Sequence, residues 1–223
     1  MEFISNIIKI LKNYWKVFLI TGVSKTLILA LITVTCGAIL GFFICLGRMG
    51  KIKPIKWILT AVVAFIRGTP MLLQLYIGYF VVPKLIGTRV SAFVCVAIAL
   101  SINSACYVSE VFRSGIESID RGQIEAGRSL GLSKKQTMMK IVLPQAIKTI
   151  LPALGNEFIM ITKDTSLAST FFVGEVMTSY LIVKGNTYLS MECLTIVAVI
   201  YFLLTFILTK LLGLFEKRLK KND

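Results

Sequence analysis

Residues 120–146 read DRGQIEAGRSLGLSKKQTMMKIVLPQA, a polar stretch that lies between two apolar parts of the chain. Asp120 is a candidate N-cap of a short helix, with Gln123 at its third position. Gly131 suits the left-handed residue that commonly ends a helix. The first half of the stretch therefore predicts a short helix that starts after Asp120 and ends at Gly131.

The second half predicts another helix. Ser133 can cap it, and Gln136 follows at the spacing of a capping box. Pro144 is expected to limit how far this helix continues, because proline lacks a backbone N–H and clashes with the preceding turn. Together the two helices form a helix–glycine–helix elbow. On its residues alone, an elbow of this kind is equally well interpreted as a solvated loop between two membrane spans.

The chain on either side of the elbow consists of long apolar runs, and a membrane-spanning helix needs about 20 such residues. We predict an all-α membrane protein with about five spans. They cover residues 27–47, 57–82, 90–109, 149–162 and 194–215. The second span is interrupted at residues 67–70, and the fourth is short and broken by Pro152 and Gly155.

Two further segments are apolar but are not expected to cross the membrane. Residues 1–18 place apolar side chains on one helical face and lysines on the others, which is typical of an interfacial amphipathic helix rather than a cleaved signal peptide. Residues 167–183 carry Glu175 and predict a short helix or re-entrant piece near the outer face, shielded by protein rather than lipid.

The basic residues indicate the orientation in the membrane. Segments 48–56, 113–148 and 210–221 hold four, seven and five of the 25 basic residues, and five spans place all three on one side. The positive-inside rule then predicts an external N-terminus and a cytoplasmic C-terminus. Four lysines before the first span weaken this asymmetry.

The composition excludes several other classes of protein. Hydrophobic residues make up 56% of the chain and charged residues 16%, and the mean hydropathy is +0.82. The net charge of +14 is spread between apolar runs, with no polar domain to bind nucleic acid. The absence of histidine and of any CxxC pair argues against a metal site, a catalytic site and a membrane-embedded enzyme. The five cysteines are interpreted as apolar packing residues.

The elbow also carries a recognisable pattern: Glu125-Ala126-Gly127, then Gly131, then nine residues, then Ile-Val-Leu-Pro at 141–144. It resembles the EAA signature of type I permease subunits in ATP-binding-cassette (ABC) importers, apart from Gly127, where the family usually has alanine. The resemblance implies that residues 117–144 form the coupling segment, which rests in a groove on the ATPase subunit. The residues expected to contact the ATPase are Glu125, Ala126, Gly127, Leu130, Gly131, Leu132 and Ser133.

Two more stretches resemble the permeases of polar amino-acid importers. They are FIRGTPMLLQ at 65–74 and NEFI at 156–159 followed by KDTSLA at 163–168. The resemblance covers the chain from about residue 22 to the last span. It implies a permease domain over 19–216, with a basic cytoplasmic tail over 217–223, in the plasma membrane of a bacterium.

The resemblance further implies partner subunits. The nearest approach to a P-loop is Gly50-Lys51, but Ile52 follows where serine or threonine is needed. ATP and magnesium are therefore expected on separate ATPase subunits, and no cofactor is expected in this chain. The assembly would hold two permeases, identical or paralogous, in the lipid bilayer, two ATPases and an external amino-acid-binding protein. From the residues alone, a secondary transporter driven by an ion gradient is the alternative.

Polar side chains within the spans are candidates for the solute path, because lipid does not tolerate them. The candidate substrate-binding residues are Thr69, Met71, Gln74, Asn156, Glu157, Lys163 and Asp164. Lys163 and Asp164 could instead form a structural ion pair or lie at the outer interface. Glu110 and Arg113 are interpreted as a structural pair, and Asn103 as a hydrogen-bonding contact between helices.

Glu157 is the most informative candidate, since it follows the expected break at Pro152 and Gly155, where an interrupted helix can expose polar groups to a cavity. A buried carboxylate needs a cationic partner from the protein or from the cargo. This predicts a basic amino acid as the solute, arginine first, with lysine, histidine and glutamine as alternatives. Gln74 could bind the α-amino or α-carboxylate group.

Overall fold

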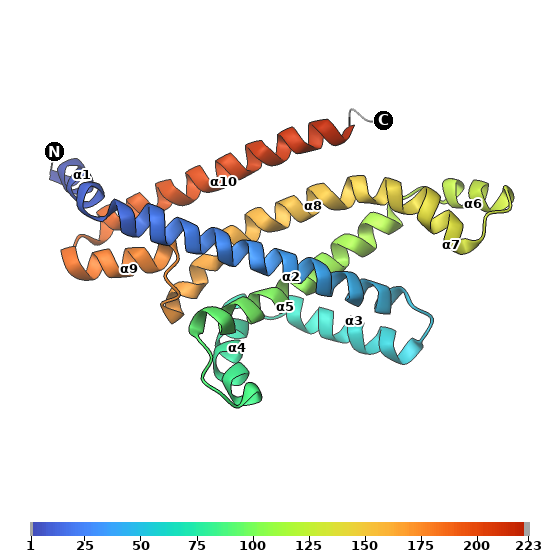
Figure 1. Cartoon of the computed structure of the whole chain (residues 1–223), viewed down its shortest axis with the longest axis horizontal. Coiled ribbons are helices and arrows are strands. Elements are labelled where there is room, and N and C mark those ends of the chain that lie inside the picture. Colours follow the sequence, from blue (N-terminus) through green and yellow to red (C-terminus); the bar gives the residue numbers. More distant parts are fainter. Residues whose placement is uncertain (1, 221–223) are drawn as a thin grey trace.

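The structure is a computed structural model that describes residues 2–220, and this part of the chain is helical with no strand (Figure 1). The elements are α1 (Glu2–Trp15), η1 (Lys16–Val23), α2 (Ser24–Met49), α3 (Lys53–Arg67), α4 (Met71–Ile86), α5 (Ala92–Glu117), α6 (Arg121–Ser129), α7 (Lys134–Thr137), η2 (Met138–Val142), α8 (Leu143–Asp164), η3 (Thr165–Phe171), α9 (Val176–Thr187) and α10 (Ser190–Lys220). Segments η1 and η2 are π-helical, and η3 is a 3₁₀ helix.

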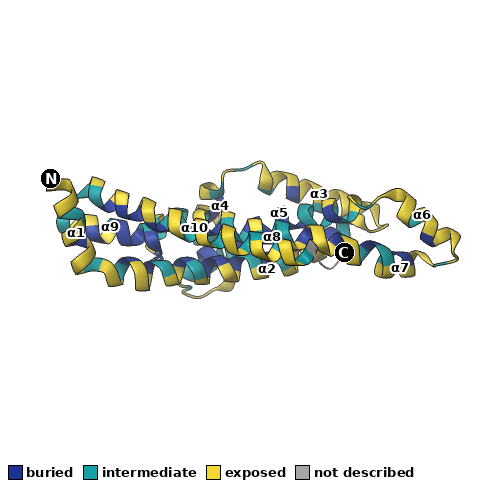
Figure 2. Ribbon diagram, turned by 90° about the horizontal axis from the view of Figure 1, so that it is seen from above, coloured by how far each residue is buried: buried dark blue, intermediate teal, exposed yellow. Residues whose placement is uncertain are grey.

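Three helical stretches are long and apolar enough to cross a membrane, and the number rises to five if each of two bent helix pairs counts as one span. Each of the five predicted spans falls within one of these stretches or pairs. The pair that contains the fourth span also includes α9, in the segment 167–183 that was not expected to cross the membrane. Figure 2 shows buried residues along the inner faces of the helices and exposed residues on their outer faces. Many of the exposed residues are large and apolar, as expected for surfaces that face lipid.

Helix α5 is the centre of the bundle. In the most apolar 18 residues of α5, 67% are buried, against 28% in the α1–α2 stretch and 22% in α10. Gly37 and Gly41 on α2 allow the backbones of α2 and α5 to approach closely. A Cβ atom at Gly41 would lie 2.8 Å from the backbone oxygen of Ala105. The sequence signal for this contact is the G-x-x-x-G spacing of the two glycines in an apolar helix.

The N-terminal segment is helical as predicted, but it is not set apart from the first span. Helices α1, η1 and α2 form one continuous stretch, Glu2–Met49. Ile10 and Phe18 are buried against residues of α9 and α10. The interfacial position of residues 1–18 stays a prediction. Of the predicted basic tail, residues 217–220 continue α10, and residues 221–223 lie outside the described part of the chain.

The second predicted span is not a straight rod. Helices α3 and α4 are bent by 110° at the expected interruption. Gln74 holds the bend, because its Nε2 donates to the backbone oxygen of Ile66 at 2.7 Å and to the hydroxyl of Thr69 at 2.8 Å. The side-chain amide thus replaces hydrogen bonds that the chain loses at Pro70, which lacks a donor.

The predicted break in the fourth span is wrong. Helix α8 runs unbroken for 22 residues with Pro152 inside it. Gly155 serves close packing rather than a break, because a Cβ atom there would lie 2.3 Å from Cδ1 of Leu212 on α10. A proline costs one helical hydrogen bond but is tolerated in membrane helices whose neighbours compensate for it.

The elbow forms largely as predicted. Asp120 caps α6 by accepting from the backbone N–H of Gly122 at 2.7 Å. Gly131 has φ of +83°, and Ser133 and Gln136 form the reciprocal capping box. The expected stop at Pro144 is wrong, because the π-helical segment η2 joins α7 directly to α8. Pro144 thus lies inside a continuous helical stretch, directly after the π-helical segment.

Candidate functional site

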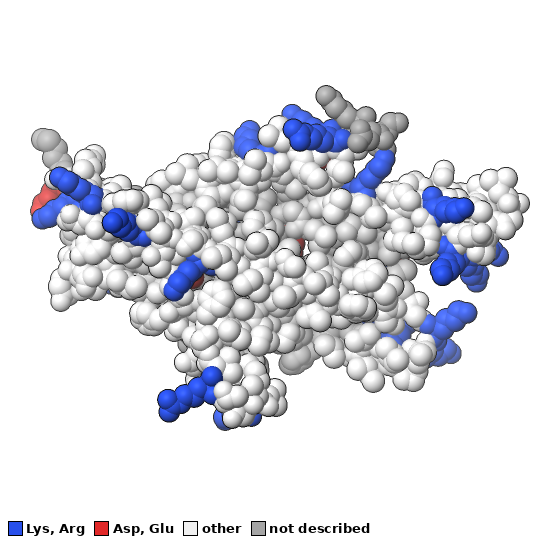
Figure 3. All heavy atoms as spheres, in the orientation of Figure 1, with Lys and Arg blue, Asp and Glu red and all other residues white. Residues whose placement is uncertain are grey.

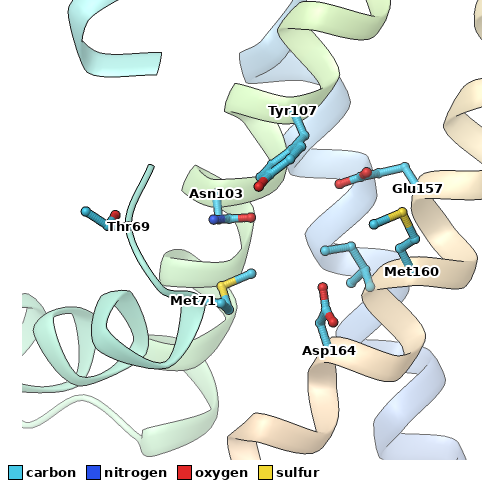
Figure 4. A pocket seen from close by; sticks show the side chains of 8 residues that line it. Thr69, Met71, Asn103, Tyr107, Glu157, Met160 and Asp164 are labelled. Carbon is cyan, nitrogen blue, oxygen red and sulfur yellow. The ribbon is translucent and has the colours of Figure 1, made fainter. Parts of the chain in front are cut away.

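A cavity of about 110 Å³ opens between α5, α8 and the start of α4. Its lining residues are Thr69, Met71, Asn103, Tyr107, Glu157, Met160, Ile161 and Asp164. Figure 4 shows Glu157, Met160 and Asp164 on α8 and Asn103 and Tyr107 on α5 reaching into the same space. Thr69, Met71, Glu157 and Asp164, four of the seven predicted substrate-binding residues, are thus brought together.

Glu157 is the most deeply placed carboxylate of this cavity, with 7% of the residue exposed. Its Oε1 accepts a hydrogen bond of 2.9 Å from the hydroxyl of Ser104 on α5. Within the described residues no basic side chain lies within ion-pairing distance of it. Ser104 was not singled out from the sequence, since the pairing depends on how α5 and α8 pack. Glu157 therefore faces the cavity with a neutral partner only.

Asp164 lies two helical turns after Glu157 and so shares its face of α8. The residue is half-buried, and it makes no ion pair with Lys163 in the part of the chain that the structure describes. Lys163 and Asn156 are exposed and do not line the cavity. Their expected contact with solute stays a prediction. Two of the lining residues, Glu157 and Asp164, are acidic, and none is basic.

Gln74 lies beside the cavity but does not line it. Its Oε1 accepts from Nδ2 of Asn103 at 2.7 Å, and its Nε2 donates to Thr69, so both ends of the amide are engaged. Both of these partners line the cavity. Asn103 thus bonds between helices as predicted, and Gln74 connects two lining residues to the α3–α4 bend.

A cluster of ion pairs forms around Glu110 on α5. Arg113 binds Glu110 at 2.8 Å, which confirms the predicted pair. Arg48 on α2 binds the same carboxylate at 2.7 Å, and Arg67 approaches it at 3.7 Å. The Arg67 guanidinium also lies 5.2 Å from the ring centre of Tyr107, a residue of the cavity. Arg48 is 62 positions from Glu110 in the sequence, so no local spacing rule could have found it.

Glu175, another acidic residue in an apolar segment, has a structural role. It is fully buried and caps α9, accepting from the backbone N–H of Thr178 at 2.7 Å and from the hydroxyl of Tyr201 at 3.1 Å. It does not line the cavity.

The elbow presents a compact exposed surface. Leu130 is 83% exposed, and Glu125, Ala126, Gly131 and Ser133 are exposed beside it. This side of the elbow is thus open to contact with another protein.

Two of the seven residues expected to contact the ATPase are not exposed and pack inward. Gly127 is buried, and a Cβ atom there would lie 2.5 Å from Cδ1 of Ile141, while Leu132 is half-buried. Glycine in place of the usual alanine is thus matched by the bulk of Ile141.

Residues 33–221 match the family described as binding-protein-dependent transport system inner membrane component. The arginine transport system permease protein ArtQ of Bacillus subtilis is 39% identical over 92% of this chain and 94% of its own. A putative glutamine transport system permease protein of Rickettsia bellii is 36% identical over 91% and 93%. A crystal structure of an amino acid ABC transporter with histidines superposes with a TM-score of 0.88, at 42% identity over 92% of this chain and 95% of that one.

The chain belongs to the family of binding-protein-dependent transport system inner membrane components, the permease subunits of ABC importers. It is a multi-pass protein of the bacterial inner membrane and is not itself an enzyme, because in this family the ATPase is a separate subunit. Family membership also removes the alternative of an ion-gradient-driven transporter.

Proposed function

We propose that this permease moves a cationic amino acid, arginine first, through the cavity between α5 and α8. The observation that carries the proposal is that Glu157 and Asp164 line this cavity and no basic residue does. A buried carboxylate without a cationic partner is costly, and a cationic cargo removes that cost. The named function of the arginine permease of Bacillus subtilis supports the same solute class.

The chemistry of the lining suits the two ends of such a solute. A guanidinium can bind a carboxylate with two parallel hydrogen bonds, which favours arginine over an ammonium cargo at Glu157. The α-carboxylate of the solute would find donors in the side chains of Asn103 and Tyr107. Gln74 acts as a positioning residue, because it holds Thr69 and Asn103 in place.

The other subunits of the transporter follow the family pattern. The permease pairs with a second, identical or paralogous, permease and with two ATPase subunits, and an external binding protein delivers the solute. The N-terminus lies outside and the C-terminus in the cytoplasm, so the elbow meets the ATPase through Leu130 and its exposed neighbours. ATP hydrolysis on the ATPase subunits opens the cavity alternately to the two sides of the membrane.

The test is binding of labelled arginine, lysine, histidine, glutamine and glutamate to the purified permease–ATPase complex. The wild type is compared with Glu157→Gln and with a control, Glu192→Gln, which changes a carboxylate on α10 that does not line the cavity. We expect arginine to bind best and Glu157→Gln to weaken it about 30-fold or more, because truncating one partner of a buried charge pair costs about 2 kcal/mol or more. The control should bind arginine as the wild type does.

Two results would contradict the proposal. If glutamine or glutamate binds best, the cavity serves a neutral or acidic solute and the cationic assignment is wrong. If Glu157→Gln leaves arginine affinity unchanged, Glu157 is structural. Neither result touches the membership of the importer family.

A further inference from the structure

A second cavity, of about 440 Å³, lies between α2, α3 and α5, outside the solute site. Its lining residues are Arg48, Met49, Lys56, Thr60, Arg113 and Glu117. It shares no residue with the cavity that holds Glu157. In Figure 1 the α2–α3 turn lies at the same end of the bundle as α6 and α7. Figure 3 shows basic side chains at this end, over the turn and over the elbow.

Positive charge exceeds negative charge around this cavity. Three of its lining residues are basic and only Glu117 is acidic. The next carboxylate, Glu110, is shared by Arg48, Arg113 and the more distant Arg67. Arg113 also binds Glu117. Four basic groups thus face two carboxylates, which leaves room for an anion.

Arg48 gives an independent sign of a missing partner. Its side chain is only 10% exposed and lines the cavity, and its Nε is buried with no hydrogen-bond partner among the described residues. An unsatisfied N–H on a buried guanidinium is costly, because the group has lost its water. The oxygens of a phosphate match the fork of a guanidinium, so a phosphate is the anion that this site suits best.

The surface next to the cavity indicates where the phosphate comes from. Met49 on α2, which lines the cavity, is 42% exposed, and Trp57 on α3, which follows Lys56 in the sequence, is 76% exposed. Exposed tryptophan beside lysine is typical of the membrane interface, and basic pockets between spans on the cytoplasmic side bind anionic headgroups. A free phosphate would make no contact with this apolar surface, whereas the acyl chains of a lipid would cover it.

We propose that the α2–α3–α5 cavity binds the phosphate of an anionic phospholipid, with its acyl chains along the exposed faces of α2 and α3. The bound lipid neutralises the surplus charge and braces the α2–α3 turn against α5. This site does not depend on which solute the permease carries.

The test uses the purified permease–ATPase complex in vesicles of phosphatidylcholine, to which phosphatidylglycerol is added. Bound lipids are counted by native mass spectrometry, with inorganic phosphate as the soluble competitor. Lys56→Gln is the main variant, because Lys56 is exposed and makes no ion pair in the described part of the chain. Lys53→Gln is its matched control, a neighbouring exposed lysine that does not line the cavity. Arg48→Lys keeps the charge beside Glu110 but removes the guanidinium fork.

We expect phosphatidylglycerol to bind in preference to phosphatidylcholine, and Lys56→Gln to weaken it about fivefold, the effect of one basic residue near an anionic membrane surface. Arg48→Lys should weaken it as well, and Lys53→Gln should not. The proposal is overturned if the two lipids bind equally or if both lysine variants lose affinity alike, since general surface attraction then suffices. It is also overturned if inorganic phosphate displaces the lipid at equal concentration, because the site is then one for a free anion.

Discussion

Gly37→Ala tests whether the packing of α2 on α5 controls the solute site. A Cβ atom at residue 37 would lie 2.6 Å from the hydroxyl oxygen of Ser104 and 2.8 Å from its Cβ. Ser104 must therefore move, and it is the residue that donates to Glu157 at 2.9 Å. Overpacking of a tight interface costs about 1–3 kcal/mol in stability. Loss of the hydrogen bond to Glu157 costs about 0.5–1.5 kcal/mol more. The same free energy, lost from arginine binding, corresponds to a rise of about two- to tenfold in the dissociation constant for arginine.

The assay combines thermal unfolding of the complex with equilibrium binding of arginine. Gly41→Ala is the matched control, because its Cβ would meet the backbone of Ala105 and Ser109 rather than Ser104. It should lower stability to a similar extent and leave arginine affinity unchanged. Ser104→Ala should lower arginine affinity at a smaller cost in stability, about 0.5–1.5 kcal/mol, since it removes the hydrogen bond without overpacking. Equal arginine affinity in the wild type and Gly37→Ala would refute the link between this packing and Glu157.

Two predictions concern the elbow. Gly131 and Gly87 both have left-handed backbones, with φ of +83° and +72° and open space where a Cβ would lie, so Gly→Ala at each costs about 1–2 kcal/mol of backbone strain alone. In Gly131→Ala, hydrogen exchange should show the elbow amides opening about fivefold faster or more, and solute-stimulated ATPase activity should fall. Gly87→Ala, at the end of α4, should leave both the elbow exchange and the ATPase activity unchanged. Unaltered elbow exchange in Gly131→Ala would show that residue 131 carries no such strain. Glu125→Lys changes an exposed side chain without an ion pair in the described chain, so its thermal stability should stay within about 0.5 kcal/mol of the wild type while uptake falls. Wild-type uptake in this variant would exclude Glu125 from the ATPase contact.

Local signals in the sequence predict local structure well in this chain. The caps at Asp120 and Ser133 and the left-handed Gly131 are all present, because each depends on residues within one helical turn. The positions of the apolar runs likewise predict the helices, since hydropathy is a sum over neighbouring residues.

Proline and glycine were harder to interpret, because the same residue can break a helix or be accommodated in one. Pro152 and Pro144 lie within continuous helical structure, and Gly155 accommodates Leu212 of another helix. Only the neighbouring helices decide between these outcomes. The partners of Glu157 and Glu110 are equally out of reach of the sequence, since Ser104 and Arg48 come from other parts of the chain.

The join at η2 has a mechanical consequence. With α7 fused to α8, the helical stretch Lys134–Phe171 begins at the tip of the elbow and carries Glu157. At 1.5 Å per residue, about 35 Å separate Lys134 from Glu157 along its axis. A displacement of the elbow is therefore transmitted to Glu157 along one continuous helical stretch, with no loop between them. The wide π-helical turn at Met138–Val142 and the missing backbone donors at Pro144 and Pro152 are the points where that helix can flex.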